Sequence, residues 1–268
     1  VCNVRFEVGA CANQNPLHGI GHRSPVYENL NQDWADKTHF HIMNGDWLYE
    51  ELRTYPPEAW RLIQGQDALP PTVKTMPSIV GVWENYKLYL SRGNELAQWH
   101  RNVPSYFTFD DHELVNDIWG SAEIGKRHRR TVFRDIGTRA WFDYLGWANP
   151  VEHPRRVHAA RGKMTAGSKL LVDPLTDFTK LPIDQMGTLH VHWGTPEAGV
   201  NNLKFDNDDG HKNSYVYQIT KVVDAHTLEL HMPAKVSDEI TYSIGRNSFG
   251  KFRVANCEFF LLDTRGSR

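Results

Sequence analysis

The chain of 268 residues lacks several features that would place it in a large class of proteins at once. No apolar run approaches the roughly 20 residues that a membrane-spanning helix needs. The formal net charge is −2, with no basic stripe to hold a nucleic-acid backbone and no acidic tail. The three cysteines form neither a disulfide framework nor a CxxC zinc pair. These absences leave a chain of ordinary composition that is long enough to bury one large or two modest cores.

The first half of the chain alternates strand-like and helix-like segments, and its strand-like segments end in reactive side chains. Segment 3–11 alternates polar and apolar residues and ends at Cys11, and segment 38–43 leads into Gly45-Asp46, with Tyr49 three residues later. In an α/β sheet, side chains at the carboxyl ends of strands project into the crevice where ligands bind. A turn followed by the start of a helix remains the alternative interpretation of the segment around Asp46.

The most informative stretch is 105–113, where an aromatic, β-prone run leads into Asp110-Asp111-His112-Glu113. Carboxylates hold hard cations, and a histidine binds a metal or moves a proton. The alternative is a polar strand end with Asp111 or His112 as a helix N-cap. Four ionisable groups in succession exceed what a cap needs, so the pattern favours a functional site.

Helical spacing predicts helices within 26–34, 78–99 and 121–147. The second half of the chain differs, because short alternating runs from residue 170 to 250 predict strands. These runs lie at 189–193, 214–219, 227–231 and 240–244. They predict an antiparallel β subdomain in residues 181–250. The apolar run 259–262 then predicts a strand buried on both faces of a parallel sheet, and Asp263 and Arg265 follow it.

Four predicted strand ends thus present a thiol, carboxylates, a phenol and an imidazole on one rim of one sheet. Such a mixture suits a site for two or more cations, with iron at the Cys and Tyr end and hard cations at the carboxylates.

The order of these motifs resembles that of the alkaline phosphatase D-like enzymes. These enzymes belong to the calcineurin-like metallophosphatases, which include the purple acid phosphatases. The resemblance covers residues 4–145 and 256–265, and its motifs are Gly9-Ala10-Cys11, Gly45-Asp46-x-x-Tyr49, Asp110-Asp111-His112-Glu113 and Leu262-Asp263-Thr264-Arg265. It implies an α/β fold, a metallophosphatase-type layered β-sheet and helix domain with an inserted antiparallel β subdomain. Residues 1–180 would be the N-terminal part of the catalytic domain, 181–250 the insert, and 251–268 a return strand.

The resemblance also implies a role for each site residue. Asp46 would bridge two cations, Cys11 and Tyr49 would bind ferric iron, and Asp111 would be a further metal ligand. Asp110 would either support the ligands or bind an additional calcium ion. His112 and Arg265 would be catalytic, His112 beside the scissile phosphate and Arg265 as a planar clamp on it. The implied cofactors are iron and a second divalent cation, either calcium or, as alternatives, zinc or manganese.

The function implied is hydrolysis of phosphate mono- or diesters by a metal-activated water, with His112 protonating the departing alkoxide. The expected partner is a small phosphate-ester substrate, in a periplasmic or extracellular location. One alternative from another class is a non-catalytic carbohydrate- or partner-binding protein, because nine tryptophans and ten tyrosines suit stacking on sugars. A metal-dependent hydrolase of another ester, such as a lactone or a sulfate, is a third reading.

One departure from the family pattern concerns its remaining ligands. They lie in a Gly-Asp-x-His segment downstream of the Asp-Thr-Arg strand, and no such segment follows Arg265. We therefore expect a complementary C-terminal chain or segment to complete the site. The alternating pair His190 and His192 is the other candidate for the missing ligands, and a surface or local metal patch is the alternative interpretation of that pair.

Overall fold

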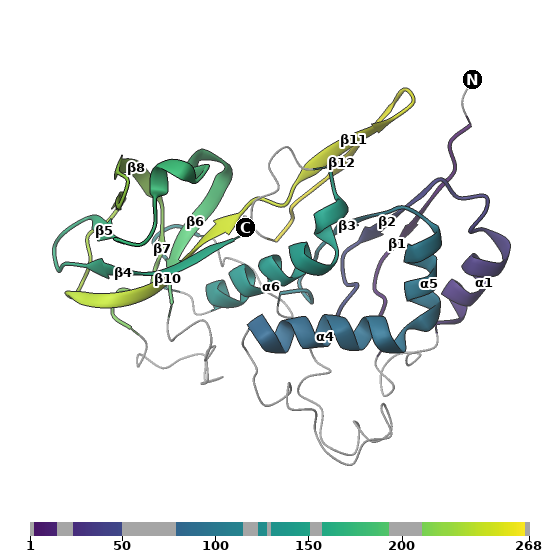
Figure 1. Cartoon of the computed structure of the whole chain (residues 1–268), viewed down its shortest axis with the longest axis horizontal. Coiled ribbons are helices and arrows are strands. Elements are labelled where there is room, and N and C mark those ends of the chain that lie inside the picture. Colours follow the sequence, from purple (N-terminus) through teal and green to yellow (C-terminus); the bar gives the residue numbers. More distant parts are fainter. Residues whose placement is uncertain are drawn as a thin grey trace, which may run out of the picture.

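The computed structural model describes residues 3–14, 24–49, 79–114, 123–127, 130–150, 157–192 and 211–265. Within these residues the chain forms a three-stranded parallel sheet, a seven-stranded antiparallel sheet and a two-stranded hairpin. The two larger sheets lie toward opposite ends of an elongated molecule, with helices between them (Figure 1). None of the helices in the described ranges is long and apolar enough to cross a membrane.

The parallel sheet has the order β1-β2-β3, with strands Phe6–Gly9, Phe40–Asn44 and Ser105–Thr108. Both pairings are parallel, so the carboxyl ends of all three strands meet at one edge. The helices that follow β1 and β2 along the chain are α1 (Pro25–Asp33), α4 (Ile79–Arg92) and α5 (Asn94–Asn102). The alternation of strand and helix predicted for the first half is therefore confirmed.

The segment 78–99, for which the spacing predicts helix, contains α4 and most of α5, and the two helices are separated at Gly93. A Cβ on this residue would lie 2.5 Å from the Gln14 side-chain nitrogen and 3.0 Å from the Tyr89 carbonyl oxygen. A larger residue at this position would displace the Gln14 side chain and crowd the Tyr89 carbonyl. Gly93 also precedes the first turn of α5 as its N-cap residue.

The core of this part is rich in aromatic residues. Trp47, Trp99 and Trp141 are fully buried, together with Tyr86 and Tyr89. Trp47 stacks on Tyr86 with ring centroids 5.7 Å apart. Each such side chain removes a large apolar area from water, so these rings stabilise the fold rather than form an exposed surface for sugars.

The antiparallel sheet has the strand order β7-β6-β10-β4-β5-β9-β8. Its strands are β4 (His158–Met164), β5 (Leu170–Val172), β6 (Met186–Val191), β7 (Val216–Tyr217), β8 (Ile219–Asp224), β9 (Thr227–Leu230) and β10 (Asp238–Arg246). The four runs predicted as strands contribute to β6 through β10. The sheet also includes β4 and β5, which precede residue 181, and the division of the chain at residues 180 and 250 stays a prediction. A separate core fills this part, with Tyr242, Leu189 and Val191 among its fully buried members.

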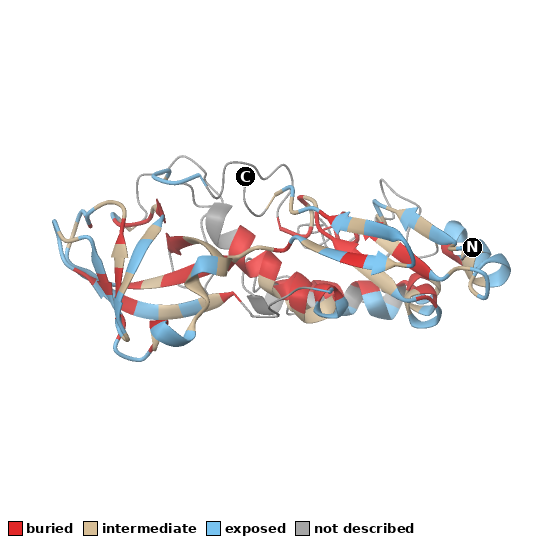
Figure 2. Cartoon of the chain, turned by 90° about the horizontal axis from the view of Figure 1, so that it is seen from above, coloured by how far each residue is buried: buried red, intermediate tan, exposed pale blue. Residues whose placement is uncertain are grey.

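Helix α6 (Arg130–Tyr144) lies between the two large sheets (Figure 1). At one point it contacts the loop after β3, because a Cβ on Gly137 would lie 2.7 Å from the Glu113 carbonyl oxygen. At another it reaches the antiparallel sheet, where Arg134 Nη1 donates to Thr188 Oγ1 at 2.9 Å and Asp135 accepts a hydrogen bond from Ser243. Buried residues continue along the centre of the molecule between the two sheets (Figure 2). A short 3-10 helix, η2 (Gly146–Ala148), follows α6, and two more, η3 (Phe178–Lys180) and η4 (Ile183–Gln185), precede β6.

The expectation of a doubly buried parallel strand at 259–262 is wrong. These residues belong to β12 (Cys257–Leu261) and the position after it, and β12 pairs antiparallel with β11 (Gly250–Val254). Phe260 and Leu262 are each 65 % exposed. The inner face of the hairpin, with Phe252 and Leu261, packs on Phe40 of the parallel sheet. An apolar run cannot by itself distinguish these two environments, because one face of a hairpin remains in water.

Candidate metal centre

The predicted site residues come together at the carboxyl edge of the parallel sheet. Cys11, Asp46 and Asp110 each lie two residues beyond the end of their strand, after β1, β2 and β3 respectively. Because the three strands are parallel and adjacent, equal offsets bring the three loops to the same edge.

The backbone of these loops is tightly fixed. Cys11 and Asp46 have left-handed conformations, with φ of 59° and 55°, and such residues persist only where the surroundings impose them. The Cys11 amide donates to the Gly45 carbonyl at 3.3 Å, and the Ala12 amide donates to the Asp46 carbonyl at 2.8 Å. Gly45 has φ of 83°, and a Cβ there would lie 2.7 Å from the Asp110 nitrogen. The loops after β1, β2 and β3 are therefore packed directly against one another.

The Asp46 carboxylate is the centre of the side-chain contacts. Its Oδ2 accepts from Cys11 Sγ at 3.4 Å and from the Tyr49 hydroxyl at 3.3 Å. Its Oδ1 is buried and has no hydrogen-bond partner within the described part of the chain. A buried carboxylate oxygen without a partner is costly, and a bound cation would satisfy it.

Asp111 and His112 complete a group of three possible ligands with Asp46. One ligand atom from each residue lies within 4.8 Å of the other two. Asp111 is buried, and the His112 ring lies against the Tyr49 ring with centroids 4.1 Å apart. Among the described residues, this is the group of histidine, cysteine and acidic side chains whose spacing suits a metal ion. The donor set of carboxylate and imidazole, with a thiol and a phenol beside it, fits iron and a harder divalent cation.

Glu113 has a structural role that the sequence pattern did not assign. Its side chain is buried and accepts from the Trp47 amide at 2.6 Å, the Asp46 amide at 3.2 Å and the Asp110 amide at 3.0 Å. One carboxylate therefore joins the loop after β2 to the loop after β3. The pattern in the sequence gives only the position of Glu113 at the end of an acidic run. The backbone amides that it binds become visible only in the fold.

The electrostatics of the cluster disfavour negative charge. Burial raises the pKa of the Asp46 carboxyl and of the Cys11 thiol above their usual values. Burial also raises the pKa of the Tyr49 phenol. For Glu113, burial and the nearby Asp46 charge raise the pKa to about 8. Positive charge placed among these groups would reverse each of these effects.

Arg265 reaches the same edge from the end of the hairpin. Its Nε is hydrogen-bonded to Asp110 Oδ1, and its Nη2 donates to Asp110 Oδ2 at 3.2 Å. The hydrogen bond to Asp110 raises the pKa of Arg265 above its ordinary value. Asp110 thus holds a planar cation beside the metal-ligand candidates, which is a geometry suited to oxyanions.

His190 and His192 lie elsewhere. His190 lies on β6 and His192 directly follows that strand, with ring centroids 5.7 Å apart. Both are buried, so the expectation of a surface patch is wrong. The group of three ligand candidates at the parallel sheet includes neither of them. The run 206–210, a second acidic segment of the sequence, falls outside the described residues.

Comparison with known proteins gives one match. A family model described as PhoD-like phosphatase matches residues 6–172, which include β1, β2, β3 and all the candidate ligands. No curated protein and no solved structure matches the chain.

Proposed function

The chain belongs to the PhoD-like phosphatase family, and from this membership and the geometry of the site we propose that it is a metal-dependent phosphoesterase. The observation that carries the proposal is the convergence of Asp46, Asp111 and His112 within 4.8 Å at the edge where three parallel strands end. In this assignment Cys11, Asp46, Tyr49 and Asp111 hold the cations, with iron at the Cys11 and Tyr49 side and calcium, zinc or manganese at the carboxylates.

Bound cations would supply an activated water and neutralise charge on the phosphoryl oxygens. The protein's own groups perform the remaining tasks. The imidazole of His112, held against the Tyr49 ring, donates a proton to the departing ester oxygen, a contribution of about 10²–10⁴-fold.

Arg265 binds the phosphate group of the substrate in this proposal. A guanidinium carries five N–H donors in a planar fork, and Asp110 engages Nε and Nη2. The ion pair fixes the plane of the guanidinium before substrate arrives, so less conformational entropy is lost on binding. In this proposal Asp110 positions Arg265.

The proposal is tested by comparing substrates on one preparation of the metal-loaded protein. We expect hydrolysis of 4-nitrophenyl phosphate, of bis(4-nitrophenyl) phosphate, or of both, and none of 4-nitrophenyl sulfate above the background of Asp46→Ala. Elemental analysis of the same sample should find iron together with a second cation. Equal rates in the wild type and in Asp46→Ala would refute the proposal. Hydrolysis of the sulfate alone would assign the site to another ester.

A further inference from the structure

A cavity of about 630 Å³ opens on the antiparallel sheet, and no residue of the metal centre lines it. Its volume is in the range typical of small-molecule sites. The lining comes from strands β4, β5 and β10, from the residues that directly follow β5 and β6, and from the segment before β7. The lining includes basic, apolar and polar side chains, among them Arg161, Lys163, Val172, Leu175, His192 and Thr241.

The first polar feature of this cavity is the His192 ring. Ser243 donates its hydroxyl hydrogen to Asp135, so its oxygen accepts from His192 Nε2, which lies 3.0 Å away. This arrangement assigns the ring proton to Nε2 and leaves a lone pair on Nδ1. Nδ1 is buried and has no hydrogen-bond partner among the described residues. An unsatisfied buried acceptor destabilises the fold, and a ligand N–H or O–H group would remove that cost.

The second feature is an excess of positive charge at the rim. Arg161 and Lys163 lie two residues apart on β4 and point to the same side of the sheet. Both are exposed, and neither side chain forms a hydrogen bond or an ion pair with any residue in the described ranges. Glu239 faces Lys163 in the register of β10 with β4 and supplies one opposing charge. At the exposed rim two cations therefore face one carboxylate, while the buried Asp173, which also lines the cavity, supplies a second opposing charge deeper in.

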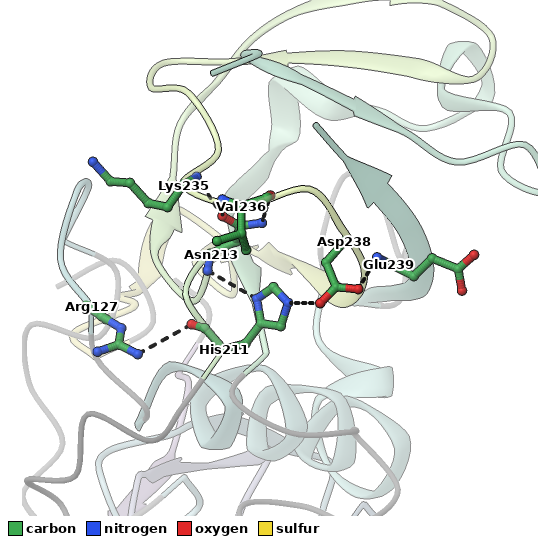
Figure 3. A network of polar contacts seen from close by, with 7 residues as sticks. All are labelled: Arg127, His211, Asn213, Lys235, Val236, Asp238 and Glu239. Atoms are coloured by element: carbon green, nitrogen blue, oxygen red, sulfur yellow. Dashed lines mark hydrogen bonds and ion pairs between the residues drawn. The ribbon is translucent and has the colours of Figure 1, made fainter. Parts of the chain in front are cut away.

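Other acidic groups near the cavity are already engaged. His211 accepts a hydrogen bond at Nδ1 from the Asn213 amide at 3.1 Å, and its Nε2 lies 3.2 Å from Asp238 Oδ2 (Figure 3). The Asp173 carboxylate accepts from the hydroxyls of Thr176 and Tyr242. These partners occupy both carboxylates. The carboxylates of Asp173 and Asp238 therefore compete less with a ligand for Arg161 and Lys163.

The third feature is an apolar wall. Val172 is 40 % exposed and Leu175 is 92 % exposed, and both line the cavity together with Pro174 and Ile240. Large apolar side chains that stay exposed beside a cavity mark a surface that gains from being covered.

We propose that this cavity is a second ligand site, and that it binds an organic anion with an apolar ring body. The anionic group pairs with Arg161 and Lys163, the ring body covers Val172 and Leu175, and a hydrogen-bond donor of the ligand reaches His192. The site is independent of the phosphoesterase proposal, because it shares no residue with the metal centre.

The test uses two fluorescent probes with the same ring body. 8-Anilinonaphthalene-1-sulfonate carries an anionic group, and N-phenyl-1-naphthylamine is its neutral counterpart. We expect saturable binding of the sulfonate to the metal-loaded full chain, and binding of the neutral probe at least about tenfold weaker, since a charge-assisted contact is worth about 1.5–3 kcal/mol.

One variant fills the cavity with a larger side chain, a second removes a positive charge from its rim, and each has a matched control. Val172→Trp should abolish sulfonate binding, whereas Leu170→Trp should keep it within about twofold, because Leu170 is similarly exposed on β5 but does not line the cavity. Arg161→Gln should weaken binding about tenfold, and Lys169→Gln should not. Three results would each overturn the proposal: no saturable binding, equal loss in both tryptophan variants, or equal affinity for the two probes.

Discussion

Asp46 lies next to the other candidate ligands of the metal centre. Its carboxylate accepts from Cys11 and Tyr49 and lies within ligand distance of Asp111 and His112. The sequence could predict this set, because each residue follows the end of a strand and parallel strands share an edge. It could not predict the role of Glu113, since that role depends on three backbone amides, two of which belong to the loop after β2.

Asp46 is proposed as a metal ligand and His112 as a proton donor, so substitutions of the two residues should have different outcomes. Asp46→Ala should lose both metal and turnover. His112→Ala should keep most of the metal and lower turnover by about 10²–10⁴-fold, the usual contribution of a general acid. Elemental analysis and initial rates on the two variants measure this. Equal metal loss in both would make His112 a ligand, a role that its place in the group of three also permits.

The phenol of Tyr49 predicts a spectroscopic signature. Burial raises its pKa, so the metal-free phenol stays protonated, and iron must displace that proton in order to bind. Iron-loaded protein should then absorb visible light through phenolate-to-iron charge transfer, and Tyr49→Phe should remove the band. An unchanged band in Tyr49→Phe, or colourless protein that contains iron, would leave Tyr49 with a packing role only.

At the scale of secondary structure, the pattern of the sequence predicted most helices and strands but not all of their partners. Alternation identified the strands β6 and β9, and helical spacing identified α1 and α6, since both signals are local. The apolar run 259–262 predicts a strand of a parallel sheet but belongs to the antiparallel hairpin β11–β12, because an apolar run does not reveal whether its second face is covered. The division between α4 and α5 falls at Gly93, which packs beside Gln14, a residue distant from it in the sequence.

The contact between α6 and the loop after β3 predicts an unusual result for Gly137→Ala. Alanine normally stabilises a helix relative to glycine by about 1 kcal/mol. Here its Cβ would lie 2.7 Å from the Glu113 carbonyl oxygen and 2.8 Å from Leu114 Cα, and backbone atoms cannot move aside cheaply. We expect a loss of about 1–3 kcal/mol in the free energy of unfolding, with weaker metal binding.

The matched control is Gly187→Ala, where the nearest atom to a Cβ lies at an ordinary 3.5 Å. Urea denaturation and metal titration should show little change in this variant. If Gly137→Ala proves as stable as the wild type, α6 does not pack on the loop as described.

Buried histidines predict the dependence of stability on pH. Burial lowers the pKa of His100, which accepts a hydrogen bond from Trp47 Nε1 at 3.1 Å, to about 3, and burial lowers that of His192 to about 3 as well. At these two positions the unfolded chain, with histidine pKa values near 6.5, binds more protons than the folded chain between about pH 3 and 6.5. The two histidines should therefore lower the free energy of unfolding as the pH falls through this range, whereas Glu113, with its pKa raised to about 8, contributes in the opposite direction above about pH 4.5. The slope should approach about 1.4 kcal/mol per pH unit for each buried histidine.

Denaturation at several pH values in this range measures the slope. His100→Asn should reduce it by the contribution of one proton, whatever the substitution does to stability at neutral pH. A slope that is the same in wild type and variant would contradict the assignment of a neutral buried imidazole.

At the scale of the whole molecule, the parallel sheet carries the proposed chemistry and the antiparallel sheet has a core of its own. Helix α6 contacts both, through Gly137 on one side and through Arg134 and Asp135 on the other. The family match covers residues 6–172 and so extends through β4 and β5. The sequence predicted the existence of the antiparallel strands. It could not predict the cavity, because that depends on residues from several strands of the finished sheet.

The central claim, that this chain hydrolyses phosphate esters through metal held at the carboxyl edge of the parallel sheet, is tested most directly by one titration. Metal-free protein receives increasing equivalents of iron together with a divalent cation, and the rate of bis(4-nitrophenyl) phosphate or 4-nitrophenyl phosphate hydrolysis is recorded. We predict no hydrolysis without metal, a rate that rises and saturates at stoichiometric metal, and no rise in Asp46→Ala. Full hydrolysis by the metal-free protein, or the same titration curve in Asp46→Ala, would contradict the account.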